Sequence, residues 1–178
     1  MSPAVPGAPS TIRPIRREEV PAVWEMLRGL AEYEKMTDIL TGDARMVEAA
    51  LFPASGPRIE VIVAESAGEL LGYALFYPIF GSFRARWRLW LEDLFVKEEA
   101  RGRGAGVLLL SALCRIAVER GWFCVDWEVL DWNEPSLEFY RRVGSHDLGG
   151  GWLRYRIDGD AMRSLAGKHA PRTAADRA

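Results

Sequence analysis

Alternate glycines and two arginines form the segment of this sequence with the clearest chemical meaning, Arg101-Gly102-Arg103-Gly104-Ala105-Gly106. It follows an apolar strand-like run, residues 91–96, and precedes a long apolar helix-like segment, residues 107–120. Alternate glycines leave successive backbone N–H groups uncovered, and the following helix adds the positive end of its dipole. With two arginines as countercharge, the segment is typical of a pyrophosphate site.

Two common phosphate loops do not match this segment. A P-loop ends in Gly-Lys-Ser or Gly-Lys-Thr, whereas this loop continues as Gly106-Val107-Leu108. A dinucleotide-binding loop follows G-x-G-x-x-G, and Val107 stands at the place of its third glycine. From the glycines alone, a helix-opening turn without a ligand is an equally good interpretation.

The composition favours a single domain with a sizeable core. The 178 residues are 49% hydrophobic and carry a formal net charge of −2, which argues against a nucleic-acid-binding protein. A local basic run, Arg84, Arg86 and Arg88, is interpreted as the solvated end of a hairpin. No nucleic-acid partner is therefore expected.

Metal chemistry and export are not expected either. The two histidines, His146 and His169, are too few and too far apart for a histidine-based metal site. The two cysteines, Cys114 and Cys124, lack metal or redox spacing and are interpreted as buried free thiols, which suits a reducing cytoplasm. Neither a signal peptide nor a membrane-spanning run is visible, so we expect a cytoplasmic protein without a membrane partner.

The order of the expected elements places the glycine loop between a strand and a helix. Strands are expected at 12–15, 59–64, 70–77, 87–96, 123–130 and 152–157, and helices at 18–33, 41–51, 107–120, 134–142 and 158–166. Asn133 serves as N-cap of the helix at 134–142, with Pro135 in its first turn. A hairpin-rich first half with inserted helices predicts a mixed α/β (α+β) domain rather than a doubly wound sheet. We expect one domain over 11–166, with disordered segments at 1–10 and 167–178.

With this order, the sequence resembles the GCN5-related N-acetyltransferases (GNAT), and within them the diamine and thialysine acetyltransferase branch. The family's pyrophosphate loop, R/Q-x-x-G-x-G/A after the fourth strand, is matched by residues 101–106. Further similar stretches are Ala31-Glu32-Tyr33-Glu34, the run 91–96, Trp132-Asn133-Glu134-Pro135-Ser136 and residues 139–144. The resemblance implies a mostly antiparallel, twisted sheet that splays between its fourth and fifth strands, flanked by helices.

The resemblance also implies acetyl transfer from acetyl-CoA to a primary amine by direct attack, and commonly a homodimer. The residues expected to hold acetyl-CoA are Leu94, Phe95, Val96, Arg101, Gly102, Arg103, Gly104, Ala105, Gly106, Val107, Asn133 and Ser136. A non-catalytic acyl-CoA-binding or nucleotide-binding module on the same fold is the alternative.

Tyr140 and Glu92 are the candidate catalytic residues. Asn133, Ser136 and Tyr140 recur at helical spacing on one face, so the Tyr140 phenol is expected to protonate the leaving thiolate. The alternative is a core tyrosine with its hydroxyl at the surface. Glu92 is the candidate base, directly or through water, and its alternative is a solvent-facing strand residue. Asp93 points to the opposite strand face unless the strand bulges there.

Acidic side chains are the candidates for holding a cationic acceptor. The expected acceptor residues are Tyr33, Glu34, Glu92, Asp126 and Glu128. Asp126 and Glu128 share one face of their strand, where two carboxylates would attract ammonium groups, although a solvated strand face is equally compatible. Diamine acetyltransferases have a longer, acidic segment where this chain has Gly149-Gly150-Gly151 before Trp152, so long polyamines are expected to be poorer acceptors.

Overall fold

The computed structural model describes residues 10–56, 58–150 and 155–167. Contacts group the chain into two compact units, Met1–Phe139 and Tyr140–Ala178. The first unit contains the sheet and the glycine loop, and the second contains the end of the fourth helix and all of the fifth. The single domain expected over 11–166 stays a prediction. Of the segments expected to be disordered, 1–10 and 167–178, residues 1–9 and 168–178 lie outside the described residues, while Gly167 is the last residue of α5.

The first unit is built on a five-stranded sheet in the order β1-β2-β3-β4-β5. All neighbours are antiparallel except β4 and β5, which are parallel. This confirms the expected mixed α/β class and the mostly antiparallel sheet. The strands are β1 (Thr11–Pro14), β2 (Glu60–Ser66), β3 (Glu69–Gly81), β4 (Arg86–Val96) and β5 (Val125–Trp127).

Local signals explain where the helices of this unit begin and end. Pro21 lies in the first turn of α1, where its missing N–H costs no hydrogen bond, and Lys35 at φ 58° follows the helix end. Asp43 caps α2 by accepting a hydrogen bond from the Met46 amide at 2.8 Å. The helices of the chain are α1 (Val20–Tyr33), α2 (Ala44–Leu51), α3 (Ala105–Glu119), α4 (Glu134–Arg142) and α5 (Gly159–Gly167).

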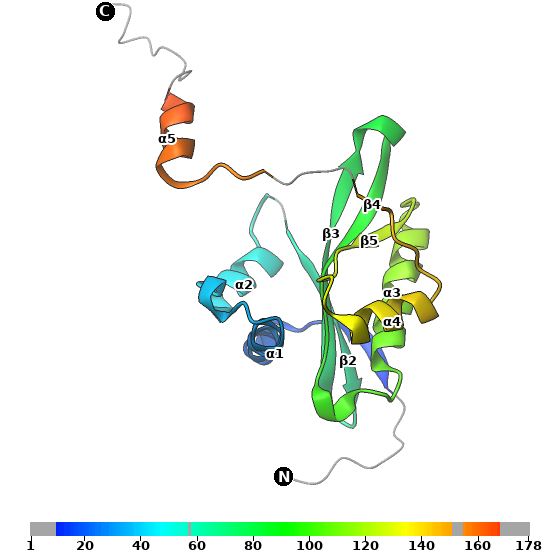
Figure 1. The fold of residues 1–178 in the computed structure, drawn as a ribbon. Helices are drawn as coiled ribbons and strands as arrows, with labels where there is room; N and C mark the ends of the chain where they lie inside the picture. The colour runs from blue at the N-terminus through cyan, green and yellow to red at the C-terminus, as the bar shows by residue number, and fades with distance from the viewer. Residues whose placement is uncertain (1–9, 57, 151–154, 168–178) are drawn as a thin grey trace, which may run out of the picture. The chain divides into compact units, whose positions relative to one another are not determined.

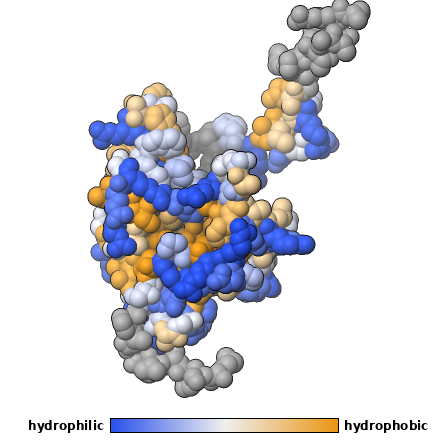
Figure 2. Space-filling model, turned by 180° about the vertical axis from the view of Figure 1, so that it is seen from behind, coloured by the Kyte–Doolittle hydropathy of each residue, from blue (hydrophilic) through white to orange (hydrophobic). Residues whose placement is uncertain are grey.

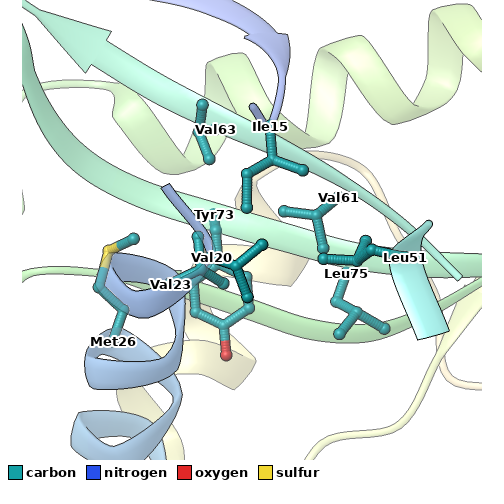
Figure 3. Close-up of a cluster of buried hydrophobic side chains, with 9 residues drawn as sticks. All are labelled: Ile15, Val20, Val23, Met26, Leu51, Val61, Val63, Tyr73 and Leu75. Atoms are coloured by element: carbon teal, nitrogen blue, oxygen red, sulfur yellow. The ribbon is translucent and has the colours of Figure 1, made fainter. Parts of the chain in front are cut away.

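Helices cover both faces of the sheet. Helices α1 and α2 lie on one face and α3 on the other (Figure 1). The α1 face contains a buried apolar cluster in which Val20, Val23 and Met26 of α1 pack near Tyr73 and Leu75 of β3 (Figure 3). Each fully buried aliphatic side chain of this kind stabilises the fold by about 1.5–3 kcal/mol. The position of β3 relative to α1 is therefore firmly determined.

Three expected strands differ from those observed. Strand β3 continues to Gly81 and forms a longer hairpin with β4 than the apolar run 70–77 indicated. The strand expected at 123–130 is wrong in length, because β5 pairs with β4 only over Val125–Trp127. For the strand expected at 152–157, residues 152–154 lie outside the described part, and the described residues Tyr155–Ile157 do not form a strand.

The surface of the described residues is mixed in character. Apolar side chains are visible between bands of hydrophilic residues on the face shown in Figure 2. Phe83, in the turn between β3 and β4, is 100% exposed, and the described side chains of α5 in the second unit are all exposed. No helix of the described residues is both long and apolar enough to cross a lipid bilayer.

Candidate functional site

The sheet opens where β4 and β5 part. Their pairing joins Leu89–Leu91 to Val125–Trp127, and beyond these residues the two strands form no further pairs in the described structure. Residues 92–96 of β4 consequently have no partner on β5, while residues 93–96 still pair with β3 on the other side. This is the splay expected between the fourth and fifth strands, and it places Leu94, Phe95 and Val96 along its edge.

A β-bulge in β4 lies directly at this opening. Leu75 of β3 pairs with Asp93 and the next residue, Phe76, pairs with Leu91, so Glu92 is an extra residue without a partner. Asp93 shares a face with Leu75, which belongs to the α1-face cluster. The bulge thus allows Glu92 and Asp93 to lie on the same face, the arrangement that a regular strand would forbid.

Two hydrogen bonds hold the Glu92 carboxylate on the α1 face. Its Oε2 accepts from the Tyr77 hydroxyl at 2.7 Å and from the Trp90 indole N–H at 2.8 Å. Tyr77 packs against the α1-face cluster, and Trp90 pairs with it across the strands. Both donors bind the same oxygen, and Glu92 as a residue is exposed.

The neighbouring carboxyl group of Asp93 is held in a very different environment. Its Oδ2 accepts a hydrogen bond from the buried Tyr73 hydroxyl at 3.3 Å. Burial is the main cause that raises the pKa of Asp93 to about 7; the charges of Glu92 and Glu34 contribute to this rise, and the hydrogen bond from Tyr73 opposes it. Burial also raises the pKa of Glu34, which caps the C-terminal end of α1. Three acidic residues therefore influence one another on this face.

The glycine loop has the geometry expected of an anion site. Gly102 and Gly104 have φ of 73° and 86°, which favour glycine, and a Cβ at either position would meet nothing within 4 Å. Gly104 is the N-cap of α3, whose first amides have no partner within the helix. Among the described residues, neither Arg101 nor Arg103 forms an ion pair with a carboxylate. Their charges are available to an anionic ligand.

Asn133 links the C-terminal end of α1 to the start of α4. It is the only buried polar or charged residue among those that the structure describes, at 4% exposure. Its Oδ1 accepts from the Tyr33 hydroxyl at 2.9 Å and from the Ser136 amide at 3.3 Å, the second bond being the expected N-cap of α4. Tyr33, expected beside the acceptor, is thus hydrogen-bonded to Asn133, a residue expected beside the cofactor.

The two carboxylates expected on β5 differ in their surroundings. Asp126 forms an ion pair with Arg88 at 3.2 Å, and its side chain is 16% exposed. It also accepts a hydrogen bond from the Cys124 thiol at 3.3 Å, and burial raises the pKa of that thiol to about 11. Glu128 is exposed and follows the end of β5. The charge of Asp126 is therefore largely neutralised before any acceptor arrives.

Tyr140 belongs to the second unit and is half-buried in the last turns of α4. Within that unit its carbonyl oxygen accepts from the Ser145 hydroxyl at 2.8 Å and from the Ser145 amide at 3.2 Å. These bonds satisfy a carbonyl at the C-terminal end of the helix. The backbone that carries the phenol is thereby fixed within its own unit.

Sequence reasoning missed the aromatic residues that organise the acidic group. Tyr73 and Tyr77 lie four residues apart on β3, so they share a face and donate to Asp93 and Glu92 respectively. Their spacing was a usable signal, since two tyrosines on one face of a strand often find polar partners when buried. Which acids they would meet depends on the register and on the bulge, which no local pattern shows. No group of three or more His, Cys, Asp or Glu within the described ranges is arranged to hold a metal ion.

Solved structures with the same fold include acetyltransferases. One neighbour is an aminoglycoside acetyltransferase from an uncultured soil metagenomic sample, with a TM-score of 0.69, 17% identity, and coverage of 84% of this chain and 97% of the other. An integron cassette protein from the mobile metagenome of V. cholerae also gives a TM-score of 0.69, at 24% identity over 90% of this chain and 99% of the other. At these identities the likeness shows the fold alone.

Relatives in sequence extend the likeness to nearly the whole chain. A thialysine N-epsilon-acetyltransferase of Sus scrofa is 34% identical over 167 residues, covering 88% of this chain and 97% of the relative. The Mus musculus protein of the same name is 33% identical over 171 residues, covering 90% and 99%. An L-ornithine N5-acetyltransferase of Arabidopsis thaliana is 33% identical over 115 residues, covering 64% and 50%.

The family model described as "Acetyltransferase (GNAT) family" matches residues 23–144. This range includes β2 to β5, the glycine loop, the bulge in β4 and Tyr140. The chain belongs to the acetyltransferase (GNAT) family and is an acetyl-CoA-dependent N-acetyltransferase.

Proposed function

We propose that this enzyme acetylates the primary amine of a small molecule, a diamine or a lysine-like amine. The observation that carries the proposal is the bulge at Glu92, which puts two carboxylates on one face at the opening between β4 and β5. The same strand leads into the glycine loop within ten residues. Relatives named for thialysine and ornithine acetylation support an acceptor of this class.

The residues at the end of β4 fit the cofactor that the family uses. Acetyl-CoA would supply the thioester, with its pyrophosphate held by residues 101–107 and its pantetheine along the open edge of Leu94, Phe95 and Val96. The positive φ of Gly102 and Gly104, the free amides of α3 and two unpaired arginines suit a doubly charged anion. Asn133 and Ser136 would complete the site at the N-terminus of α4.

Removing a proton from the acceptor is the harder chemical step. An ammonium of pKa ~10.4 and an ordinary glutamate of ~4.3 differ by ~6 units, or ~8 kcal/mol. We assign Glu92 as the base, directly or through water, with Asp93 as the adjacent carboxyl group. Asp93 has a pKa of about 7. If the proton moves on to Asp93, the pKa difference from the ammonium falls to ~3.4 units, or ~5 kcal/mol. Burial next to a second acid is what makes Asp93 the better proton acceptor.

Protonation of the leaving thiolate is assigned to Tyr140. A phenol of pKa ~10 and a thiol of ~8.5 differ by only ~1.5 units, so the transfer costs ~2 kcal/mol. Support comes from the position of Tyr140 on α4, seven residues after Asn133 and thus on the same helix face. The cytoplasmic location and the homodimer that the family resemblance suggests stay predictions.

The first prediction concerns the glycine loop. Gly104→Val puts a β-branched residue at φ 86° and covers the amides at the N-terminus of α3, so acetyl-CoA affinity should fall tenfold or more, ~1.4 kcal/mol. Gly121→Val is the matched control, because Gly121 has φ 67° at the other end of the same helix. Calorimetry should show native affinity for a folded control. Equal losses in both variants would contradict a phosphate role for the loop.

The second prediction concerns the acid and the base. Glu92→Gln and Tyr140→Phe should each lower kcat roughly 10²-fold or more while acetyl-CoA affinity stays within about twofold, because both groups act on protons in the transition state. Glu69→Gln, at the start of β3, and Tyr155→Phe, at a residue 90% exposed, are the matched controls. Near-native turnover of either active-site variant, with chemistry rate-limiting, removes that residue from the mechanism.

The third prediction uses the pKa of Asp93. A folded-state pKa raised to about 7 means that the charged form is disfavoured by folding, so stability is lost as pH rises toward 7 and stays low above it. Asp93→Asn should therefore raise the free energy of unfolding at pH 8 by roughly 1–3 kcal/mol, below the ~4 kcal/mol that three pKa units represent, and by little at pH 4.

Asp126→Asn is the control with the opposite sign. It leaves Arg88 without its counterion, and the buried Arg88 Nε already lacks a hydrogen-bond partner among the described residues. This variant should lose stability at pH 8. Denaturant unfolding at the two pH values measures both effects. A gain for Asp93→Asn that is the same at pH 4 and pH 8 would show that Asp93 is not the titrating group.

The fourth prediction concerns the choice of acceptor. Short diamines and thialysine-like amines should rival or exceed spermine in kcat/KM, because Asp126 is already paired with Arg88 and the glycines before Trp152 supply no acid for a distant ammonium. The missing ion pair at a partly exposed site is worth up to ~1 kcal/mol. A steady-state amine screen measures this. Spermine ahead by a hundredfold, or acetylation of protein N-termini only, would contradict the assignment.

A further inference from the structure

Three segments far apart in sequence meet at the C-terminal end of α1. Tyr33, the last residue of α1, contacts Arg101 of the glycine loop and Asn133 at the start of α4. The contacts use different parts of the tyrosine: the ring faces the guanidinium carbon of Arg101 at 5.4 Å, and the hydroxyl donates to Asn133 at 2.9 Å. A phenylalanine would reproduce only the ring contact, and a leucine would reproduce neither contact.

The ring contact holds a charged side chain that no carboxylate neutralises. Arg101 donates from Nε to the Val96 carbonyl oxygen at 3.1 Å, and its planar group lies over the Tyr33 ring. Within the described residues it forms no ion pair. A guanidinium that lies on an aromatic ring keeps its charge and the N–H donors at its edge, so it can still bind an anion. Its conformational freedom is already restricted, which lowers the entropy cost of binding.

The hydroxyl contact fixes a buried amide. Asn133 is 4% exposed and receives two hydrogen bonds on Oδ1, which determines how its side-chain NH₂ is directed. Trp132 lies against the same tyrosine, with ring centroids 6.3 Å apart. Tyr33 therefore contacts the glycine loop through Arg101 and the start of α4 through Trp132 and Asn133.

We infer that Tyr33 is a positioning residue for the CoA moiety, which seats Arg101 with its ring and Asn133 with its hydroxyl. The inference rests on the proposed function, because it assigns the ligand of the loop to CoA. It also separates Tyr33 from its neighbour Glu34, whose charge acts on Asp93 at the acidic side of the site. One helix end would thus serve cofactor and acceptor through adjacent residues.

A double-mutant cycle on CoA binding tests this inference in the full chain without any acceptor. Tyr33→Leu should weaken CoA about fivefold by calorimetry, and Arg101→Gln should weaken it more. The double variant should bind CoA less than twofold more weakly than Arg101→Gln alone, because the Tyr33 ring acts through Arg101. Tyr33→Phe, which keeps the ring, should lie within about threefold of wild type. Tyr155→Leu is the exposed control and should bind CoA normally.

Steady-state kinetics supply the readout that a merely structural role would not give. KM for acetyl-CoA should rise in Tyr33→Leu, while kcat at saturating acetyl-CoA and KM for the amine stay within twofold. Two results would overturn the inference and leave the proposed function standing. One is a Tyr33→Leu variant with native CoA affinity and a raised KM for the amine. The other is a cycle in which the losses of CoA affinity are fully additive. Absence of CoA binding by the wild-type chain would overturn both. If Tyr33→Leu fails to fold, Arg101→Lys, which keeps charge without the planar group, should still weaken CoA.

Discussion

Strand β4 pairs antiparallel with β3 on one side and parallel with β5 on the other, and these two pairings determine the rest of the site. It pairs with β3 along its whole length but with β5 over three residues only, and its register against β3 shifts at Glu92. The shift brings Glu92 and Asp93 to one face, and the end of pairing leaves the next residues open on the other edge. Because the glycine loop follows directly, one strand positions the acidic group, the open edge and the anion site. The packing of Tyr73 and Leu75 against α1 holds β3, and through it the register of β4.

Local patterns in the sequence predicted most elements and the turn that the glycine loop forms before α3. The glycine spacing at 102–106, the N-cap at Asn133 and the apolar period of α1 are signals within a few residues, and all three lie where they were expected. Features that depend on pairing were not predictable. The bulge is one unpaired residue whose neighbours alternate normally, and β5 is short because β4 diverges from it. The contact between Tyr33 and Asn133 joins residues 100 positions apart, and no local pattern indicates it. The contacts of the candidate acceptor residues were therefore less predictable than the backbone of the glycine loop.

The electrostatics of the site follow from which acids are paired. Asp126 is paired with Arg88, whereas burial and the charges of Glu92 and Glu34 raise the pKa of Asp93, and no basic side chain is among the causes that shift it. Holding such a group together is unfavourable for the folded chain, and a cationic amine entering it would relieve the repulsion. The cost in stability and the attraction for the acceptor thus have one origin. The two arginines of the glycine loop carry the opposite charge, and in the proposed function they bind the pyrophosphate end of the cofactor.

A crystal structure of the protein with CoA and an unacetylated diamine tests the central claim most directly. The account predicts the pantetheine along residues 94–96 between β4 and β5, the pyrophosphate on the amides of residues 102–107, and the reacting amine on the α1 face. The amine should lie within hydrogen-bonding distance of Glu92 or of a water bound to it, with the Tyr140 hydroxyl near the sulfur. An amine bound on the α3 face, or a cofactor that does not enter the opening beyond Leu91, would contradict the account.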